Sequence, residues 1–508
     1  MLQEMRVRRS LKNLIYGSAS QAISSLLNFV VRYVLIHTLG ATAVSLNGLF
    51  TEVLAVLSMA ELGVGSAIVY HLYGPLKEND EERLTRLMNL FKTAYRLIAL
   101  AVFVIGLALL PWVHLLVSKM EIDLGYLRFI YFLFLVQTAS SYLFSYKTAL
   151  LNADQKVFVV SQCTLIARVF SAAASIAFLF LTGNYIVYLL IQIITTVSIN
   201  ISVSFKANRL YPFLKRKEKL LFAEAKEILS NIKYLFIEVL SGKITNSTDN
   251  ILISTMVGTL HIGAYSCYTM LVHAMSSLML QLHHATTGSI GNLVAEGNNN
   301  YTETVLRRLT FITYCPTIVG VVGIYTVSTP FIHLLYGKDY LLPMPVVFVC
   351  IMNLLIYCIK NPLWYMMTVS GLFAQNKNIS LTGDFLNLIV SILLGRKLGI
   401  LGILLGTSCT LIIQYALKGW VLFRRFLYVD GMKYIALVMK ILCTGIVCIL
   451  CAQAVCIRLM VSNLYFQVLL YGICSVAITI GINFLVFHSN REFQYAVDII
   501  KSLLGGKA

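Results

Sequence analysis

The chain has 508 residues, 58% of them hydrophobic, and its mean hydropathy of +0.80 is too high for a soluble protein of this length. Soluble domains are roughly 45–50% apolar, and a long soluble chain splits into domains joined by polar linkers, which this sequence lacks. The net charge of +18 would fit a nucleic-acid-binding protein, but the basic residues flank the apolar runs, as they do in membrane proteins. We therefore exclude nucleic acid as a partner and predict an integral membrane protein.

Apolar runs of about 20 residues follow one another along the chain, and each is long enough to cross about 30 Å of hydrocarbon as a helix. The sequence predicts an all-α polytopic membrane protein with about fourteen transmembrane helices. The predicted spans cover residues 14–36, 44–72, 91–117, 125–150, 157–181, 185–205, 232–257, 262–287, 309–335, 342–370, 378–395, 398–423, 434–456 and 463–487.

Basic residues gather in alternate loops. The amino terminus, the connection 206–231 and the carboxy-terminal segment are rich in lysine and arginine. The positive-inside rule therefore predicts that both termini are cytoplasmic. The basic start leads into a full-length span without a small-residue cleavage site, so we expect no cleavable signal peptide. The opposite loops carry few basic residues, and the pair Arg396–Lys397 is the one loop that argues against this topology.

The connection 206–231 is the longest, and its basic, amphipathic pattern predicts a position on the cytoplasmic membrane surface. It separates a six-helix lobe, residues 1–205, from a second six-helix lobe, residues 232–430. Residues 431–508 are expected to add two helices and a cytoplasmic tail. Short similarities between the lobes, such as 153–156 with 374–377, favour a duplication, which implies a central cavity between two lobes.

Charged residues inside the spans are the candidate functional residues, because each costs about 2.5–3.5 kcal/mol at mid-membrane and usually faces a cavity or a partner. The test is whether helical neighbours on the same face are also polar. We interpret six residues as substrate-binding and three acids as coupling or ion-pair residues; the alternative is polar networks that only hold helices together. The substrate-binding candidates are Arg32, Arg168, Lys243, Asn246, Asn250 and Lys360, and the acids are Glu61, Asp249 and Asp384.

The four candidate cations outnumber the three acids, which suggests an anionic ligand such as a phosphate group. Lys147 and Lys418 lie near the inner ends of their spans and are expected to snorkel. Gly402-x-x-x-Gly406 is interpreted as a helix-packing motif. The eleven cysteines, with Cys448 and Cys451 among them, are read as small packing residues. We expect no cofactor, no metal and no catalytic residues.

Several local patterns occur in a fixed order along this six-plus-six-plus-two layout. They are Glu61-Leu62-Gly63 with Ala67 and His71 to Leu76, Asn152 to Lys156, Thr248 to Ser254, Gly263 to Tyr268, Gly291 to Leu293, and Tyr336 to Tyr340. Together they resemble the Wzx-type polysaccharide flippases of the multidrug/oligosaccharidyl-lipid/polysaccharide exporter (MOP) superfamily. Cys267 departs from the small polar residue that the family pattern would place there.

The resemblance implies a substrate, a polyprenyl-pyrophosphate-linked oligosaccharide moved from the inner to the outer leaflet by alternating access between two lobes. It also implies the cytoplasmic membrane of a bacterium as the location, and membrane lipids and polysaccharide assembly proteins as partners. No motif identifies the glycan.

Two other functions compete with this interpretation. A drug or cation antiporter of the same superfamily would favour an acidic amino-terminal cavity, whereas Glu61 is the only acid we place at depth in that lobe. A membrane glycosyltransferase or polymerase would need a large outer loop or a catalytic domain, and the predicted outer loops are about ten residues at most.

Overall fold

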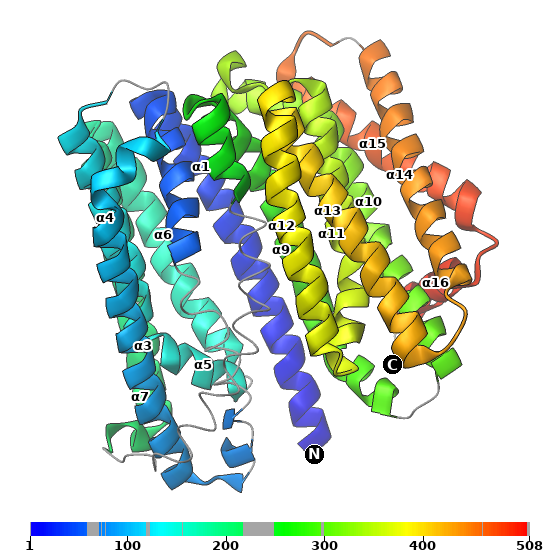
Figure 1. Ribbon diagram of the computed structural model, residues 1–508, viewed down its shortest axis with the longest axis horizontal. Coiled ribbons are helices and arrows are strands. Elements are labelled where there is room, and N and C mark those ends of the chain that lie inside the picture. The colour runs from blue at the N-terminus through cyan, green and yellow to red at the C-terminus, as the bar shows by residue number, and fades with distance from the viewer. Residues whose placement is uncertain are drawn as a thin grey trace. The chain divides into compact units, whose positions relative to one another are not determined.

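The computed structural model describes residues 2–57, 71–72, 74–76, 78–117, 122–154, 156–216, 248–295, 299–459 and 461–504. These residues are almost entirely helical and include no strand. The chain divides into two compact units, Met1–Gly263 and Ala264–Ala508 (Figure 1). The predicted lobe boundaries stay predictions, and the linker residues 217–231 lie outside the described part of the chain.

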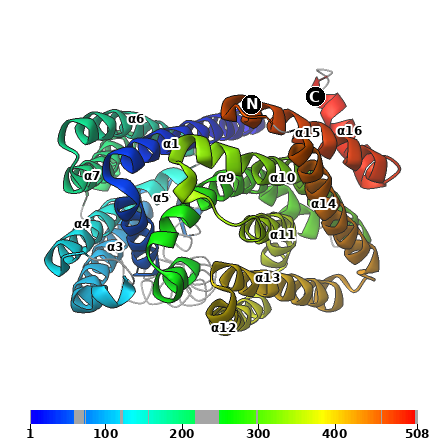
Figure 2. The ribbon, with the colours of Figure 1, turned by 90° about the horizontal axis from the view of Figure 1, so that it is seen from above.

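Unit 1 is a bundle in which α6 lies between the first part of α1 and α7, and α4 lies between α7 and α3 (Figure 2). The helix α9 begins in unit 1 and continues into unit 2. The elements of unit 1 are α1 (Leu2–Leu57), α3 (Glu81–Leu109), η2 (Leu110–Leu116), α4 (Leu124–Tyr142), α5 (Ser145–Ala153), α6 (Val157–Thr182), α7 (Tyr185–Leu210), η3 (Pro212–Lys215) and η4 (Ile253–Val257), followed by α9 (Leu260–Ala295).

In unit 2, α10 contacts α11, α14, α15 and α16, while α13 packs between α11 and α12. Figure 2 shows α12 and α13 side by side at the edge of this unit. The elements are α10 (Asn299–Tyr336), η5 (Lys338–Tyr340), α11 (Met344–Val369), α12 (Phe373–Leu398), α13 (Ile400–Leu422), η6 (Phe423–Leu427), α14 (Met432–Arg458), α15 (Leu464–Phe487) and α16 (Arg491–Leu504).

The described helices confirm an all-α polytopic membrane protein. Ten of them are long and apolar enough to cross a membrane, or eleven if the bent pair α4–α5 is one span. The predicted count of fourteen stays a prediction, because most of the predicted span 232–257 lies outside the described residues. The predicted span 14–36 and the first part of the predicted span 44–72, as far as Leu57, lie in the single helix α1, which kinks at Gly40. The φ of 73° at this residue is one that glycine adopts without strain.

The span predicted at 125–150 is broken into α4 and α5, which meet at a bend of 42°. The break leaves backbone carbonyls without their usual helical donors, and in hydrocarbon such groups need a partner within the protein. The side-chain amide of Asn200 on α7 supplies it, donating to the carbonyl oxygens of Ser140 and Ser141, each at 3.1 Å. Asn200 on α7 therefore stabilises the break between α4 and α5.

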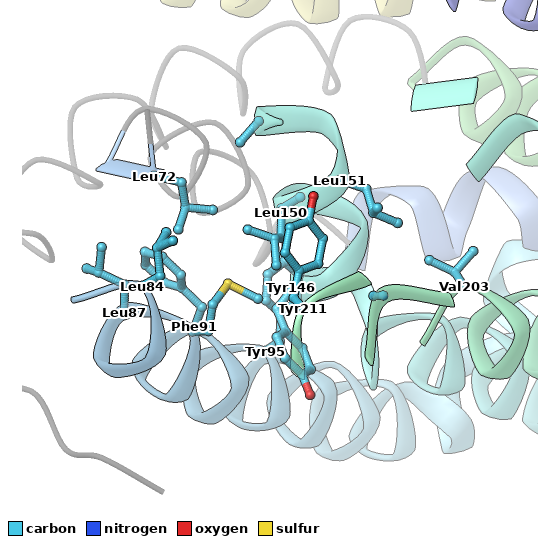
Figure 3. Packing of buried hydrophobic residues seen from close by; sticks show 14 of the residues in the cluster. Leu72, Leu84, Leu87, Phe91, Tyr95, Tyr146, Leu150, Leu151, Val203 and Tyr211 are labelled. Carbon is cyan, nitrogen blue, oxygen red and sulfur yellow. The ribbon is translucent and has the colours of Figure 1, made fainter. Parts of the chain in front are cut away.

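The basic end of unit 1, which is its predicted cytoplasmic end, has a hydrophobic core of its own. We define this end by Arg83, Lys156 and Arg209, where α3 begins, α5 meets α6 and α7 ends. Figure 3 shows Phe91 and Tyr95 of α3 together with Tyr146 of α5 in this core. The core fixes α3 against α5 just beyond the break.

The carboxy-terminal segment, predicted as a tail, contains the amphipathic helix α16. It is attached to the start of α10 by a buried ion pair between Glu492 and Arg307, and the Nε of Arg307 lies 2.7 Å from the Oε1 of Glu303. The ring of Phe493 contacts those of Phe311 and Phe484. Apolar residues at helical spacing (Phe493, Ala496, Val497) produce this face, which the prediction of a plain tail overlooked.

The helices α12 and α13 pack closely at the predicted packing motif. A Cβ built on Gly402 would lie 2.2 Å from the backbone oxygen of Leu394, and one on Gly406 would lie 2.7 Å from the backbone nitrogen of Ser391. The hydroxyl of Ser391 donates to the carbonyl oxygen of Ile403 at 3.0 Å across the same contact. The motif therefore packs helices, as predicted.

We expect Gly402→Ala to lower the free energy of unfolding by about 1–3 kcal/mol, because the added methyl group meets backbone that cannot move aside. Chemical unfolding of the purified protein in detergent measures the change. Gly481→Ala in α15 is the matched control, since its Cβ meets nothing within 4 Å. Equal stability of the two variants would contradict the proposed contact.

Candidate functional site

A buried polar cluster joins α11, α12 and α13 in unit 2. On α12 one polar helical face is buried along its whole length; it is formed by Ser380, Asp384, Asn387 and Ser391. The Nε2 of Gln414 on α13 donates to the Oδ1 of Asp384 at 3.2 Å and to the carbonyl oxygen of Ser380 at 3.2 Å. The polar residues of α12 thus form hydrogen bonds with the neighbouring helix α13.

Lys418 belongs to this cluster, which corrects the expectation that it snorkels. Its side chain is 2% exposed, and its Nζ donates to the hydroxyl of Ser380 at 2.9 Å. A snorkelling lysine would extend toward water beyond its helix end. Lys418 turns instead to α12, because the buried acid Asp384 lies one turn away from Ser380.

Lys360 on α11 reaches the same region. Its ammonium lies 5.8 Å from the centroid of the Tyr357 ring and within electrostatic range of Asp384. The side chain keeps part of its surface exposed. The structure therefore brings two predicted residues together, Lys360 and Asp384, and adds Gln414 and Lys418, which the sequence reading did not select.

In unit 1, Arg168 lies on α6 near the middle of the helix, and its side chain is exposed. Ser171 and Ser175, three and seven residues further along the same helical face, are buried. Among the residues that the structure describes, no hydrogen bond or ion pair involves the Arg168 guanidinium. An arginine at this depth is costly in hydrocarbon, so exposure indicates contact with water or with a polar ligand.

Arg32 on α1 is half-buried, and its Nη2 donates to the carbonyl oxygen of Gly263 at 3.4 Å. The segment that carries Gly263 also receives a hydrogen bond from Ser45 at Leu260. Contacts along α1 and α6 pair Tyr16 with Phe158 and Ser20 with Ser161, so the two helices run in parallel. Arg168 therefore lies about five residues, or roughly 7.5 Å, from the level of Arg32 along the bundle.

Asp249 and Asn250 are buried in unit 1, at 7% and 8% exposure. The Oδ1 of Asn250 has no hydrogen-bond partner among the described residues. The remaining candidates, Glu61, Lys243 and Asn246, lie outside the described residues. The proposed binding set is therefore seen in part, with Arg32, Arg168, Asn250 and Lys360 placed.

Glu52 is a half-buried acid that the sequence analysis did not select. It is half-buried on α1, twelve residues past the kink at Gly40, or about 18 Å along the helix. Glu61 is therefore not the only acid at depth in this part of the chain. The signal was available, because Glu52 interrupts the apolar pattern of its predicted span.

Lys147 corrects a second expectation of snorkelling. It is 7% exposed in the first turn of α5, and its Nζ donates to the hydroxyl of Ser204 on α7 at 2.6 Å. All eleven cysteines are free, and Cys448 is buried while Cys451 is exposed. Within the described residues, no three histidine, cysteine, aspartate or glutamate side chains gather as a metal site requires.

Comparison with known proteins identifies both a family and a fold. The model of the family described as "Polysaccharide biosynthesis protein" matches residues 10–286, more than half of the chain. The solved structure of the lipid II flippase MurJ, in an inward closed conformation, matches with a TM-score of 0.67 and 17% identity over 93% of this chain and 99% of that one. No curated protein matches the chain.

Two further solved structures are MOP superfamily transporters. A multidrug resistance MATE family transporter in its inward-facing conformation matches with a TM-score of 0.60 and 14% identity, over 79% of this chain and 97% of that one. A transporter from Pyrococcus furiosus, described as having a binding pocket of reverse polarity, matches with a TM-score of 0.59 and 13% identity, over 83% and 96%. At these identities the likenesses show the fold alone.

We expect Gln414→Leu to lower the free energy of unfolding by about 1–3 kcal/mol, because the Asp384 carboxylate loses a buried donor. Thermal and chemical unfolding in detergent measure the effect. Thr382→Val is the control: this residue lies on the exposed face of α12, and its hydroxyl bonds only within its own helix, to the carbonyl of Asn378. A Gln414 variant as stable as this control would show that the hydrogen bond to Asp384 does not stabilise unit 2.

Proposed function

The chain belongs to the polysaccharide biosynthesis protein family and has the fold of MOP superfamily transporters, and on that premise we propose that it is a lipid-linked oligosaccharide flippase. It translocates a polyprenyl-pyrophosphate-linked oligosaccharide from the inner to the outer leaflet of the bacterial cytoplasmic membrane. The glycan then enters lipopolysaccharide or capsule biosynthesis. The family match over residues 10–286 is the observation that carries this proposal.

The proposed binding residues are Arg32, Arg168, Lys243, Asn246, Asn250 and Lys360, with Glu61, Asp249 and Asp384 in coupling or pairing roles. Arg168 has the strongest support, because its mid-helix guanidinium is exposed and has no partner among the described residues. A pyrophosphate offers the oxygens that an arginine fork binds in bidentate fashion. Lys360 has weaker support, since Asp384 already lies within its electrostatic range.

Asn250 is the best-supported amide in this set. Its buried Oδ1 has no hydrogen-bond donor among the described residues, and an unmet buried acceptor is unfavourable. A sugar hydroxyl is the kind of donor that would satisfy it. Alternating access between two lobes, as the family resemblance implies, would then expose these residues to one leaflet at a time.

A cation-coupled exporter is the second candidate, and Glu52 is the observation that favours it. A half-buried carboxylate on α1 supplies the kind of group that binds sodium or a proton. Glu52→Gln tests the second candidate: ion-dependent drug efflux by the natural chain that is lost in this variant, together with no glycan export by the natural chain, would favour the antiporter.

Replacing Arg168 by alanine should reduce glycan export about tenfold or more, which corresponds to the loss of one charge-assisted hydrogen bond to phosphate. Glutamine should behave like alanine, whereas lysine should keep part of the activity because a point charge still attracts phosphate. The measurement is surface glycan in a flippase-deficient strain that expresses each variant.

Thermal stability of the same purified variants tests the structural alternative. Arg458→Ala, an exposed arginine at the end of α14, is the control and should export normally. If Arg168 only pairs with a buried acid, its loss should lower stability and leave export normal, and this result would remove Arg168 from the substrate site.

The proposed topology has both termini in the cytoplasm. An alkaline phosphatase fused after Ala508 should therefore be inactive, because this enzyme matures only outside the cytoplasm. The same phosphatase inserted after Asn184, in the predicted outer turn between α6 and α7, should be active. The opposite pattern would invert the topology.

A further inference from the structure

The ammonium of Lys147 is held inside unit 1 beside the break between α4 and α5. Its donated hydrogen bond to Ser204 fixes it between α5 and α7. The rings of Tyr146 and Phe144 flank it, with centroids 5.6 and 5.7 Å from the Nζ. Burying a cation costs several kcal/mol unless an opposite charge offsets it.

A second basic side chain lies near this ammonium, and a third lies near the neighbouring Tyr146. Lys92 on α3 lies within electrostatic range of Lys147, and Arg96, one turn further along α3, lies within range of the Tyr146 hydroxyl. Each follows by one residue a core residue, Phe91 or Tyr95, that packs with Tyr146 in Figure 3. This register places Lys92 and Arg96 beside the α3–α5 contact.

Within the described part of the chain, no ion pair neutralises these three cations. Lys92 and Arg96 keep exposed surface, so the cluster is open on the α3 side. Like charges in a partly buried site repel each other. Three basic side chains without an acid repel one another, and a bound anion would offset this repulsion.

The three cations also share a depth in the membrane. Residues 97–113 of α3 with η2, and residues 129–146 of α4 and α5, carry no charged side chain, and Lys92, Arg96 and Lys147 lie just beyond these stretches at the basic end. On α7, the uncharged residues 185–205 end at Lys206 in the same way. This is the level of lipid phosphates, where basic residues meet headgroups.

We propose that Lys92, Arg96 and Lys147 form a binding site for the phosphate of a membrane lipid at the basic end of unit 1. Lys147 is its buried element, and Lys92 and Arg96 receive the headgroup from the membrane side. The site uses none of the residues proposed to bind the oligosaccharide, and it does not depend on glycan transport. Both an anionic phospholipid and a polyprenyl pyrophosphate carry the required group.

The test is a lipid titration of the full-length protein in phosphatidylcholine nanodiscs, with the melting temperature followed as phosphatidylglycerol is added. A ligand that binds only the folded state raises this temperature, and the rise grows with the ratio of the ligand concentration to its dissociation constant. Lys147→Gln and Lys92→Gln should each need about tenfold more phosphatidylglycerol for half of the full shift. Lys147→Arg should respond like the natural protein.

Lys433→Gln is the matched control, because Lys433 is an exposed lysine at the start of α14 in unit 2. It should titrate normally. If Lys147→Gln does not fold, Arg96→Gln and Lys92→Gln carry the test, since neither side chain is fully buried. Unchanged titrations of both, or equal responses to phosphatidylcholine and phosphatidylglycerol in the natural protein, would overturn the site.

A second titration with a polyprenyl pyrophosphate in place of phosphatidylglycerol identifies the source of the phosphate. Half of the full shift at a lower mole fraction would assign the site to the transported lipid, and the reverse would assign it to bulk phospholipid. A response to neither lipid would reject it. Failure of glycan export with a normal lipid response would instead count against the proposed function alone.

Discussion

Hydrocarbon offers no hydrogen-bond partners, so each polar group that this chain carries into the membrane must be satisfied by another part of the chain or by a ligand. The break between α4 and α5 shows the first solution, because Asn200 donates to two carbonyl oxygens at the break. The α12–α13 contact shows it again, with Gln414 and Lys418 meeting Asp384 and Ser380. At Arg168 the described residues provide no partner, and the proposed substrate would supply one.

The same constraint is met in different ways at two places in the chain. In unit 2 the polar side chains of α12 and α13 face each other, and close helix packing at Gly402 and Gly406 encloses them. In unit 1 the basic side chains Arg168 and Lys92 keep exposed surface. A buried network that satisfies itself holds helices together, whereas accessible cations remain available to anions.

Sequence periodicity predicted the helices and the two spans on either side of Gly40, because apolar length and helical spacing are local properties. The resemblance to polysaccharide flippases is confirmed by the family match. Periodicity could not tell that Lys147 and Lys418 turn inward, since that depends on hydroxyls of helices distant in sequence. It also missed the broken span, because the break falls at Leu143 and Phe144, and neither residue is a proline or a glycine that would mark it.

The attachment of α16 to α10 has a consequence for how the protein is made. Arg307 and its partner Glu492 are 185 residues apart, so during synthesis the arginine is paired with Glu303 well before Glu492 has been made. The contact at the start of α10 is therefore completed only when α16 has been synthesised and places Phe493 against Phe311. A chain that stops before α16 would lack these contacts. Its Arg307 and Phe311, left uncovered by α16, would distinguish it from a chain that contains α16.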